Sequence, residues 1–135
     1  VLWGHTMHIE HMALWTPDLE RSRAFYQRYF GACANARYQN PHSGFQSYFL
    51  QFSEGARLEL MQMPGIAAGP DNRQQQHTGW IHLAFTVGSH AEVDALTARL
   101  VADGYPCLDG PRETGDGYYE SCVADPDGNR LEITA

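Results

Sequence analysis

Two histidines and two glutamates stand at matching places in the two halves of this chain. His11 and His82 each open the pattern histidine, large apolar residue, alanine, large apolar residue, while Glu59 and Glu132 each follow an arginine and a leucine. The histidines lie 71 residues apart and the glutamates 73. This repetition predicts a duplicated unit that contributes one imidazole and one carboxylate from each copy.

Two neutral imidazoles and two carboxylates are a donor set for a divalent cation. The carboxylates would balance the charge of the ion, and the lack of a thiolate favours zinc, nickel, cobalt, manganese or iron over a soft metal. A substrate that binds through neighbouring oxygens can displace a glutamate, which then takes a proton from the adjacent carbon. Glu132 is the first candidate for this base and Glu59 is a close second, because the repeat makes them nearly equivalent.

An ordinary structural role is the alternative for each of these residues taken alone. A histidine in a strand is more often not a ligand, and a glutamate between leucines is usually the solvent-facing member of an alternating strand. A structural role would not require the same polar pair twice, however. The recurrence therefore favours the metal site.

The elements that must position these donors can be traced in the first half. A strand over 7–15 is followed by a helix for which Thr16 is the expected N-cap, with Pro17 at the first helical position and Gly31 at the end. Three further strands are expected, over 33–39, 45–52 and 57–63. A polar stretch over 64–78 has the composition of a linker.

The second half repeats the order strand, helix, strand, strand, strand. A helix is expected over 89–103, with Ser89 and Glu92 as a capping box. The strands are expected over 80–87, 105–108, 118–124 and 129–134, the last two joined by a turn at 125–128. The sequence thus predicts an α+β protein in which two modules, 7–63 and 79–135, form a single domain over 1–135.

Strand alternation predicts that the four donors lie on the faces that the helices leave free. In the strand over 80–87, His82 alternates with Leu83 and Phe85, whose apolar side chains suit a face covered by a helix. Glu59 and Glu132 alternate with apolar residues in the same way. We therefore expect curved sheets with helices outside and an inner cleft that holds a metal and a small ligand.

Composition excludes several kinds of partner. The formal net charge is −7 and only nine residues are lysine or arginine, which disfavours nucleic acid because its binding depends on clustered cations. Without an apolar run of membrane-spanning length or a recognisable leader, we expect a soluble, cytoplasmic protein that does not bind membranes. Three cysteines without close pairing fit a reducing compartment. The first six residues carry no pattern, so His5 is given no role.

The repeated phrases resemble the vicinal oxygen chelate superfamily, which contains glyoxalase I, methylmalonyl-CoA epimerase, extradiol dioxygenases, fosfomycin resistance proteins and bleomycin-binding proteins. The resemblance runs nearly end to end, and its carriers are residues 9–14, 18–22 with Phe25 and Tyr26, Gly31, 57–60, 82–85 and 125–132. It implies paired βαβββ modules whose curved mixed sheets enclose a divalent metal. It also implies a homodimer, in which modules of different chains can complete each site.

The donor set distinguishes branches of this superfamily. Glyoxalase I resembles the chain at all four donor positions, whereas dioxygenases and fosfomycin enzymes use two histidines and one carboxylate, and bleomycin binders need no metal. The resemblance implies a metal-dependent lyase or isomerase that removes a proton next to a metal-chelated oxygen of a small molecule. The alternatives are an extradiol-type dioxygenase and a non-catalytic binding or resistance protein.

The resemblance breaks at two substrate-binding positions. Short bacterial glyoxalase I has an arginine four residues after its first histidine and an asparagine four residues after its first glutamate, and both contact glutathione. Trp15 and Met63 occupy these places here. Their apolar side chains imply a substrate that is less anionic than a glutathione adduct.

Other residues are candidates for lining the substrate pocket. Arg112, in a glycine-rich stretch expected to be a loop over 109–117, is a candidate carboxylate anchor, with a solvated loop arginine as the alternative. Tyr118, Tyr119 and Glu120 follow it, and whichever parity faces inward is expected to line the pocket; core packing is the alternative.

Overall fold

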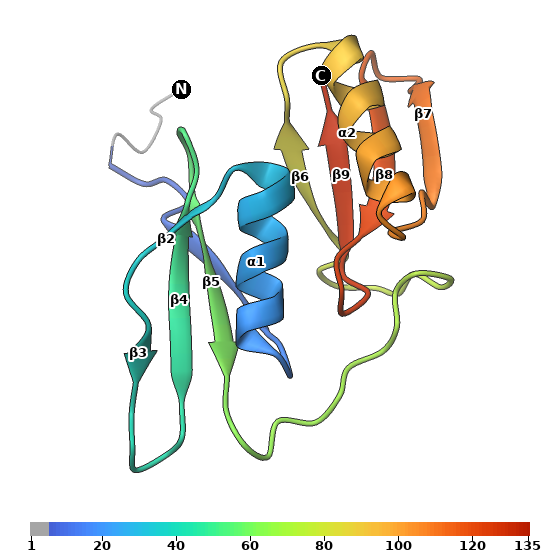
Figure 1. Ribbon diagram of the computed structural model, residues 1–135. Helices are drawn as coiled ribbons and strands as arrows, with labels where there is room; N and C mark the ends of the chain where they lie inside the picture. Colours follow the sequence, from blue (N-terminus) through green and yellow to red (C-terminus); the bar gives the residue numbers. More distant parts are fainter. Residues whose placement is uncertain (1–5) are drawn as a thin grey trace. The chain divides into compact units, whose positions relative to one another are not determined.

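The computed structural model describes residues 6–135, which divide into two compact units, one ending at Ala67 and the other beginning at Ala68 (Figure 1). His5 lies outside the described residues. In both units a strand precedes a single helix, and the remaining strands follow it. Within the described part of the chain no helix is long and apolar enough to cross a membrane.

The first unit is a five-stranded mixed sheet with one helix against it. Its elements are β1 (His11–Trp15), α1 (Leu19–Phe30), β2 (Cys33–Ala34), β3 (Tyr38–Gln39), β4 (Gln46–Gln51) and β5 (Arg57–Gln62). The strands lie in the order β1, β5, β4, β2, and β3 also pairs with β4. β1 runs parallel to β5, and the other pairs are antiparallel.

Helix α1 is held against the sheet by an aromatic and aliphatic core. The buried apolar side chains of the helix and its sheet include Leu19, Phe25, Tyr26, Tyr29, Leu50, Leu58 and Leu60. The strand leucines alternate with residues that stay partly exposed, as the period of two requires. The partly exposed residues that alternate with the leucines therefore lie on the face of the sheet that α1 does not cover.

The start of α1 differs from the sequence prediction. The N-cap is Asp18, whose carboxylate accepts a hydrogen bond from the backbone N–H of Arg21, so Thr16 as N-cap and Pro17 as first helical residue were both wrong. Thr16 is buried, and its hydroxyl bonds with Ser22 Oγ at 2.9 Å and accepts from the backbone N–H of Asp18. Gly31 ends the helix in the left-handed region, as predicted.

The second unit is a four-stranded mixed sheet with one helix. Its elements are β6 (His82–Thr86), α2 (His90–Ala102), β7 (Asp109–Glu113), β8 (Tyr119–Ala124) and β9 (Arg130–Thr134). The order is β6, β9, β8, β7, with β6 parallel to β9. The buried core includes Val93, Leu100, Val123, Leu131 and Ile133. Ser89 caps α2 as predicted, because its hydroxyl accepts from the backbone N–H of Glu92.

One strand of the second unit lies later in the chain than the sequence predicts. Tyr105 does not begin a strand, because its N–H closes α2 by donating to the Leu100 carbonyl. The strand instead spans Asp109–Glu113, which was expected to be a loop. Glycine and proline are depleted in strands, and pairing with β8 overrides that preference, with a register shift between Asp109 and Arg112.

The strand expected over 33–39 is interrupted. Asn35 replaces regular pairing: its N–H donates to the Phe49 carbonyl, and its side-chain oxygen accepts from the Phe49 N–H. The chain therefore pairs with β4 in two short pieces, β2 and β3.

Part of the polar stretch over 64–78 packs within the second unit. Arg130 donates from Nε to the Asn72 carbonyl at 2.6 Å and from Nη2 to the Arg73 carbonyl at 3.2 Å. Arg73 in turn donates to the Pro126 carbonyl in the turn between β8 and β9. This turn closes through the Gly128 N–H and the Asp125 carbonyl, at the place that the sequence predicts.

Candidate functional site

The first unit places His11 beside Glu59. In the parallel pair of β1 and β5, His11 is the partner of Arg57, and Ala13 is the partner of Glu59. The imidazole Nε2 of His11 lies 3.8 Å from Oε1 of Glu59. Both side chains alternate with less exposed residues: Met12 follows His11, and the buried Leu58 and Leu60 flank Glu59.

The second unit repeats this arrangement in the same register. His82 is the partner of Arg130 and Ala84 is the partner of Glu132 in the parallel pair of β6 and β9. Nε2 of His82 lies 3.1 Å from Oε1 of Glu132. Each unit thus presents one imidazole and one carboxylate, generated by the same backbone pairing.

These pairs suit a divalent cation in chemistry and spacing. Two donors bound at about 2.1 Å to one ion lie about 3.0–3.5 Å apart in a tetrahedral or octahedral shell. The 3.1 Å separation in the second unit falls in this range, and the 3.8 Å separation in the first needs a side-chain shift of a few tenths of an ångström. Within residues 6–135, no three His, Cys, Asp or Glu residues gather as a metal-binding group.

His11 is oriented by two neighbours. Its Nδ1 lies 2.9 Å from Oε2 of Glu10, and its ring meets Phe49 edge-on with centroids 5.4 Å apart. An ionised carboxylate only accepts hydrogen bonds, so Glu10 favours the tautomer with the proton on Nδ1, in which Nε2 offers the lone pair that a metal requires. The Arg57 guanidinium, and after it the His11 imidazole, holds the pKa of Glu10 below its usual range.

His82 has a different neighbour, the carboxyl pair of Glu132 and Glu120. Glu120 lies on β8, two residues from Cys122, which is the register partner of Glu132. Burial raises the pKa of Glu120, and the Glu132 carboxylate, to which it is hydrogen-bonded, raises it further. The second unit therefore gathers one more carboxyl group beside its donor pair than the repeat alone predicts.

The residues at the two substrate-binding positions lie where the parallel strands β1 and β5 end. Trp15 shares a face with His11, and its ring meets Phe45 edge-on with centroids 6.0 Å apart. Tyr38 lies 6.1 Å from Phe45, measured between ring centroids. Met63 follows the end of β5 and is partly exposed. This side of the unit is aromatic and apolar.

The candidates in the second unit separate by strand parity. Tyr119 donates from its hydroxyl to Asp94 on α2, at 2.5 Å, so it faces the helix and Glu120 faces Glu132. Tyr118 precedes β8 and is exposed. Arg112 lies on β7 rather than in a loop, and its Nη2 lies 3.1 Å from Asp109 Oδ2. Its guanidinium is thus already engaged by a carboxylate.

Comparison with known families agrees with these features. The family model of the glyoxalase/bleomycin resistance protein/dioxygenase superfamily matches residues 8–133. The chain belongs to this superfamily. The match covers both units, and it confirms the resemblance that the repeated phrases predict.

Two relatives of this chain are proteins described as uncharacterized. An uncharacterized protein of Bacillus subtilis, YqjT, is 31% identical over 130 residues, which cover 94% of this chain and 98% of the relative. An uncharacterized protein of Pseudomonas aeruginosa, PA2024, is also 31% identical over 130 residues, covering 93% of this chain and 86% of the relative.

Solved structures confirm the fold class. The trypanothione-dependent glyoxalase I of Leishmania major is similar with a TM-score of 0.72 at 23% identity, covering 95% of this chain and 86% of that one. Lactoylglutathione lyase of Agrobacterium tumefaciens is similar with a TM-score of 0.65 at 26% identity, covering 93% and 91%. The mixed α+β fold with two open sheets is that of the superfamily.

Proposed function

We propose that this protein is a divalent-metal-dependent lyase or isomerase of the glyoxalase I type, acting on a small molecule. The observation that carries the proposal is the identical register of the two histidine–glutamate pairs, His11 with Glu59 and His82 with Glu132. A single polar pair on a sheet face has many explanations, but two pairs built by the same backbone pairing match the four-donor set of that branch.

His11, Glu59, His82 and Glu132 would hold the ion, from one chain or from two chains of a homodimer. Zinc, nickel, cobalt, manganese and iron all suit this donor set. When bound, the ion supplies Lewis-acid stabilisation of negative charge on the substrate oxygens. Glu10 keeps the proton on Nδ1 of His11, and so keeps Nε2 available as a ligand.

Glu132 is the proposed base that takes the substrate proton. Its neighbour Glu120 distinguishes it from Glu59, because the position equivalent to Glu120 in the first unit is occupied by Ser47. A hydrogen-bonded carboxyl next to the base can share the proton after transfer, and close carboxyl groups favour holding one proton between them. Glu59 is the second choice because it occupies the equivalent place in the first unit.

Trp15 and Met63 are proposed to contact the substrate in place of the polar residues that bind glutathione in short bacterial glyoxalase I. The edge-on contact of Trp15 with Phe45 supports an apolar wall on this side of the site. Arg112 and Tyr118 are proposed to lie at the rim. The substrate is therefore expected to carry fewer charges than a glutathione adduct.

Metal analysis of protein purified without added metal tests the proposal. The parent protein is expected to retain a divalent ion, and His11→Ala and Glu132→Gln are expected to lose it, because each removes a ligand. His42→Ala is the matched control, since His42 is an exposed histidine of the first unit outside the pairs. Unchanged metal stoichiometry in both ligand variants would refute the assignment.

Turnover tests the reaction. With thiol adducts of methylglyoxal as substrates, Glu132→Gln is expected to lower kcat about 100-fold or more, because it removes both the general base and a ligand of the ion. A smaller thiol than glutathione is expected to be preferred, because Trp15 and Met63 replace the glutathione-binding residues.

The wider separation of His11 and Glu59 favours one alternative. If Glu59 stays off the ion, the remaining donors are two histidines and one carboxylate, the set of an extradiol-type dioxygenase. Oxygen uptake with catechols that depends on ferrous iron would select this alternative. Full ligand binding after metal removal would instead select a non-catalytic binding or resistance protein.

A further inference from the structure

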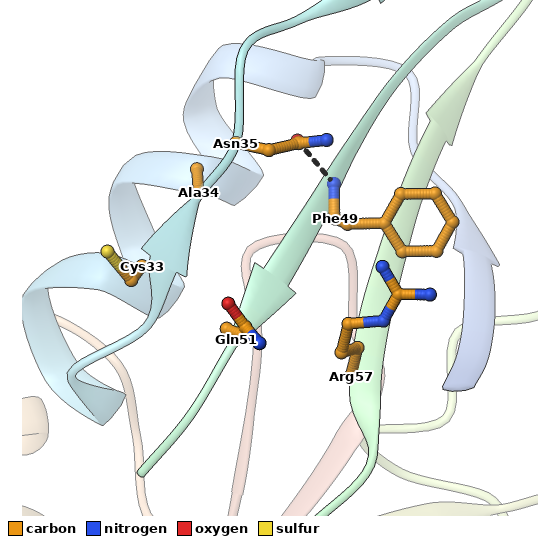
Figure 2. A pocket seen from close by; sticks show the side chains of 6 residues that line it. All are labelled: Cys33, Ala34, Asn35, Phe49, Gln51 and Arg57. Carbon is orange, nitrogen blue, oxygen red and sulfur yellow. Dashed lines mark hydrogen bonds between the residues drawn. The ribbon is translucent and has the colours of Figure 1, made fainter. Parts of the chain in front are cut away.

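A small cavity opens in the first unit (Figure 2). Its volume is ≈ 170 Å³, and it is lined by Cys33, Ala34, Asn35, Phe49, Gln51 and Arg57. Arg57 is the register partner of His11, and Phe49 is the register partner of Glu59. The cavity therefore lies on the same sheet face as the proposed metal donors. At about 30 Å³ for each water-sized group, it has room for about five or six such groups.

Arg57 is the cation of this cavity. Its guanidinium lies against the Phe49 ring (Figure 2), with the guanidinium carbon 4.2 Å from the ring centroid. Its Nη2 pairs with Glu10, which is itself exposed. A guanidinium carries five N–H donors. The Phe49 ring fixes the plane of the Arg57 guanidinium, and Glu10 pairs with Nη2 alone. The group is thus held ready for a planar anion with two oxygens.

The equivalent arginine of the second unit is used differently. Arg130 stands at the same register position, opposite His82. Its Nε and Nη2 donate to backbone carbonyls of Asn72 and Arg73, and its Nη1 contacts Cys122 Sγ at 3.6 Å. All three side-chain nitrogens of Arg130 therefore contact other parts of the second unit. Arg57 has no such segment docked on it among the described residues, and it faces a cavity instead.

We propose that Arg57 anchors a carboxylate of the substrate in this cavity. A guanidinium binds a carboxylate through two parallel hydrogen bonds, and the Gln51 amide supplies a further donor at the cavity wall. A monoanion fits better than a dianion such as phosphate, because Glu10 and Glu59 already place negative charge nearby. One carboxylate is also consistent with a substrate less charged than a glutathione adduct.

The spacing restricts the substrate further. Arg57 and Glu59 are two residues apart on one strand, which is about 6.6 Å along the sheet. A carboxylate at Arg57 and metal-binding oxygens near Glu59 would therefore be separated by about five or six bonds of an extended chain. This defines a short acid that bears its two chelating oxygens a few carbons from the carboxylate. This part rests on the proposed function, whereas carboxylate binding by the cavity needs no metal.

Titration of the metal-free protein tests the proposal. Propionate is the probe and propionamide is its uncharged counterpart, with binding followed by NMR of the Arg57 Nε–H and the Asn35 and Gln51 side-chain amides. Propionate is expected to shift these signals saturably, and propionamide is not. Arg57→Gln is expected to weaken propionate binding about tenfold or more. Arg37→Gln is the matched control, because Arg37 belongs to the same unit and pairs with Glu20 on α1.

Two further variants keep the test decisive. Arg57→Lys keeps the charge but loses the two-pronged geometry, so it is expected to bind propionate more weakly than the parent. This variant replaces Arg57→Gln in the test if Arg57→Gln does not fold. Glu10→Gln releases one donor of Arg57 and removes a negative charge, so tighter binding is expected. Equal shifts with propionamide, parent-like affinity in Arg57→Gln, or weaker binding in Glu10→Gln would overturn the proposal. Metal content is expected to be unchanged in Arg57→Gln, which separates this result from the test of the metal site.

Discussion

The two units share a backbone arrangement but surround it with different side chains. In both, a parallel strand pair sets a histidine opposite an arginine and an alanine opposite a glutamate. On the neighbouring strand, Phe49 stands opposite Glu59, whereas Cys122 stands opposite Glu132. Burial keeps the pKa of the Cys122 thiol high, so this position supplies packing rather than charge.

The difference shows how a repeated pair can acquire two roles. Phe49 supports both His11 and Arg57, and it leaves the arginine facing a cavity. In the second unit the arginine is tied to the chain over 72–73, and Glu120 joins Glu132 instead. We infer that the first unit is arranged to receive a charged part of a ligand and the second to accept a proton.

The largest expected contrast is between the two arginines. Arg130→Gln, which removes donors to two backbone carbonyls, is expected to lower the free energy of unfolding of the metal-free protein by about 2 kcal/mol. Arg57→Gln is expected to cost less than about 1 kcal/mol, because it removes an exposed ion pair and a contact with one ring. Urea unfolding measures both. Equal losses would mean that Arg57 is a structural residue like Arg130.

A smaller contrast concerns Glu120, which stands where the first unit has Ser47. Because burial raises the folded-state pKa of Glu120 above the ordinary value of a glutamate, the folded protein binds more protons than the unfolded chain. Stability from this group is present at low pH and is lost as the pH rises through the folded pKa. Glu120→Gln is therefore expected to be more stable than the parent at pH 7, by less than about 1 kcal/mol.

The measurement is urea unfolding of metal-free protein at several pH values. The free energies of unfolding of the parent and of Glu120→Gln are expected to converge below about pH 4, where the parent carboxyl is protonated in both the folded and the unfolded state. Glu113→Gln on β7 is the control for loss of one charge from the same sheet. A pH-independent gain in Glu120→Gln would show that packing, not charge, sets the difference.

Much of this arrangement follows from the sequence, because strand alternation and the repeat are local signals. The period of two puts each histidine on the same face as the glutamate of its unit, and the helix ends at Gly31 and Ser89 are fixed by adjacent residues. β7 was missed because its Asp-Gly-Pro-Arg-Glu sequence carries turn residues. Its strand character comes from β8, a partner that local propensity does not contain.

The cavity and the roles of the arginines could not be predicted in this way. Arg57 and Arg130 occur in nearly the same phrase, and only distant partners separate them: Glu10, 47 residues away, and Asn72, 58 residues away. The one available signal was the acidic residue directly before His11, for which the second unit has Ile81. That difference between the repeats indicates that the two halves are not interchangeable.

The smallest expected contrast lies on the helix-facing sides of the two sheets. In the first unit the Tyr48 hydroxyl donates to Glu20 on α1, at 2.7 Å, and this bond lowers the pKa of Glu20. In the second unit the matching contact joins two hydroxyls, Ser121 and Thr97, at 2.7 Å, and it is buried. One contact therefore depends on a charge and the other does not.

Tyr48→Phe is expected to lower stability by about 0.5 kcal/mol at pH 7, because Glu20 is half-exposed and solvent weakens the bond. A depressed folded-state pKa means that this stability is present above the unfolded pKa and is lost as the pH falls through the folded pKa. The penalty of Tyr48→Phe should therefore vanish in acid. Ser121→Ala, with no titrating partner, is expected to cost about the same, at about 1 kcal/mol or less, at every pH. If both penalties respond alike to pH in urea unfolding, the charged contact is not what distinguishes the first unit from the second.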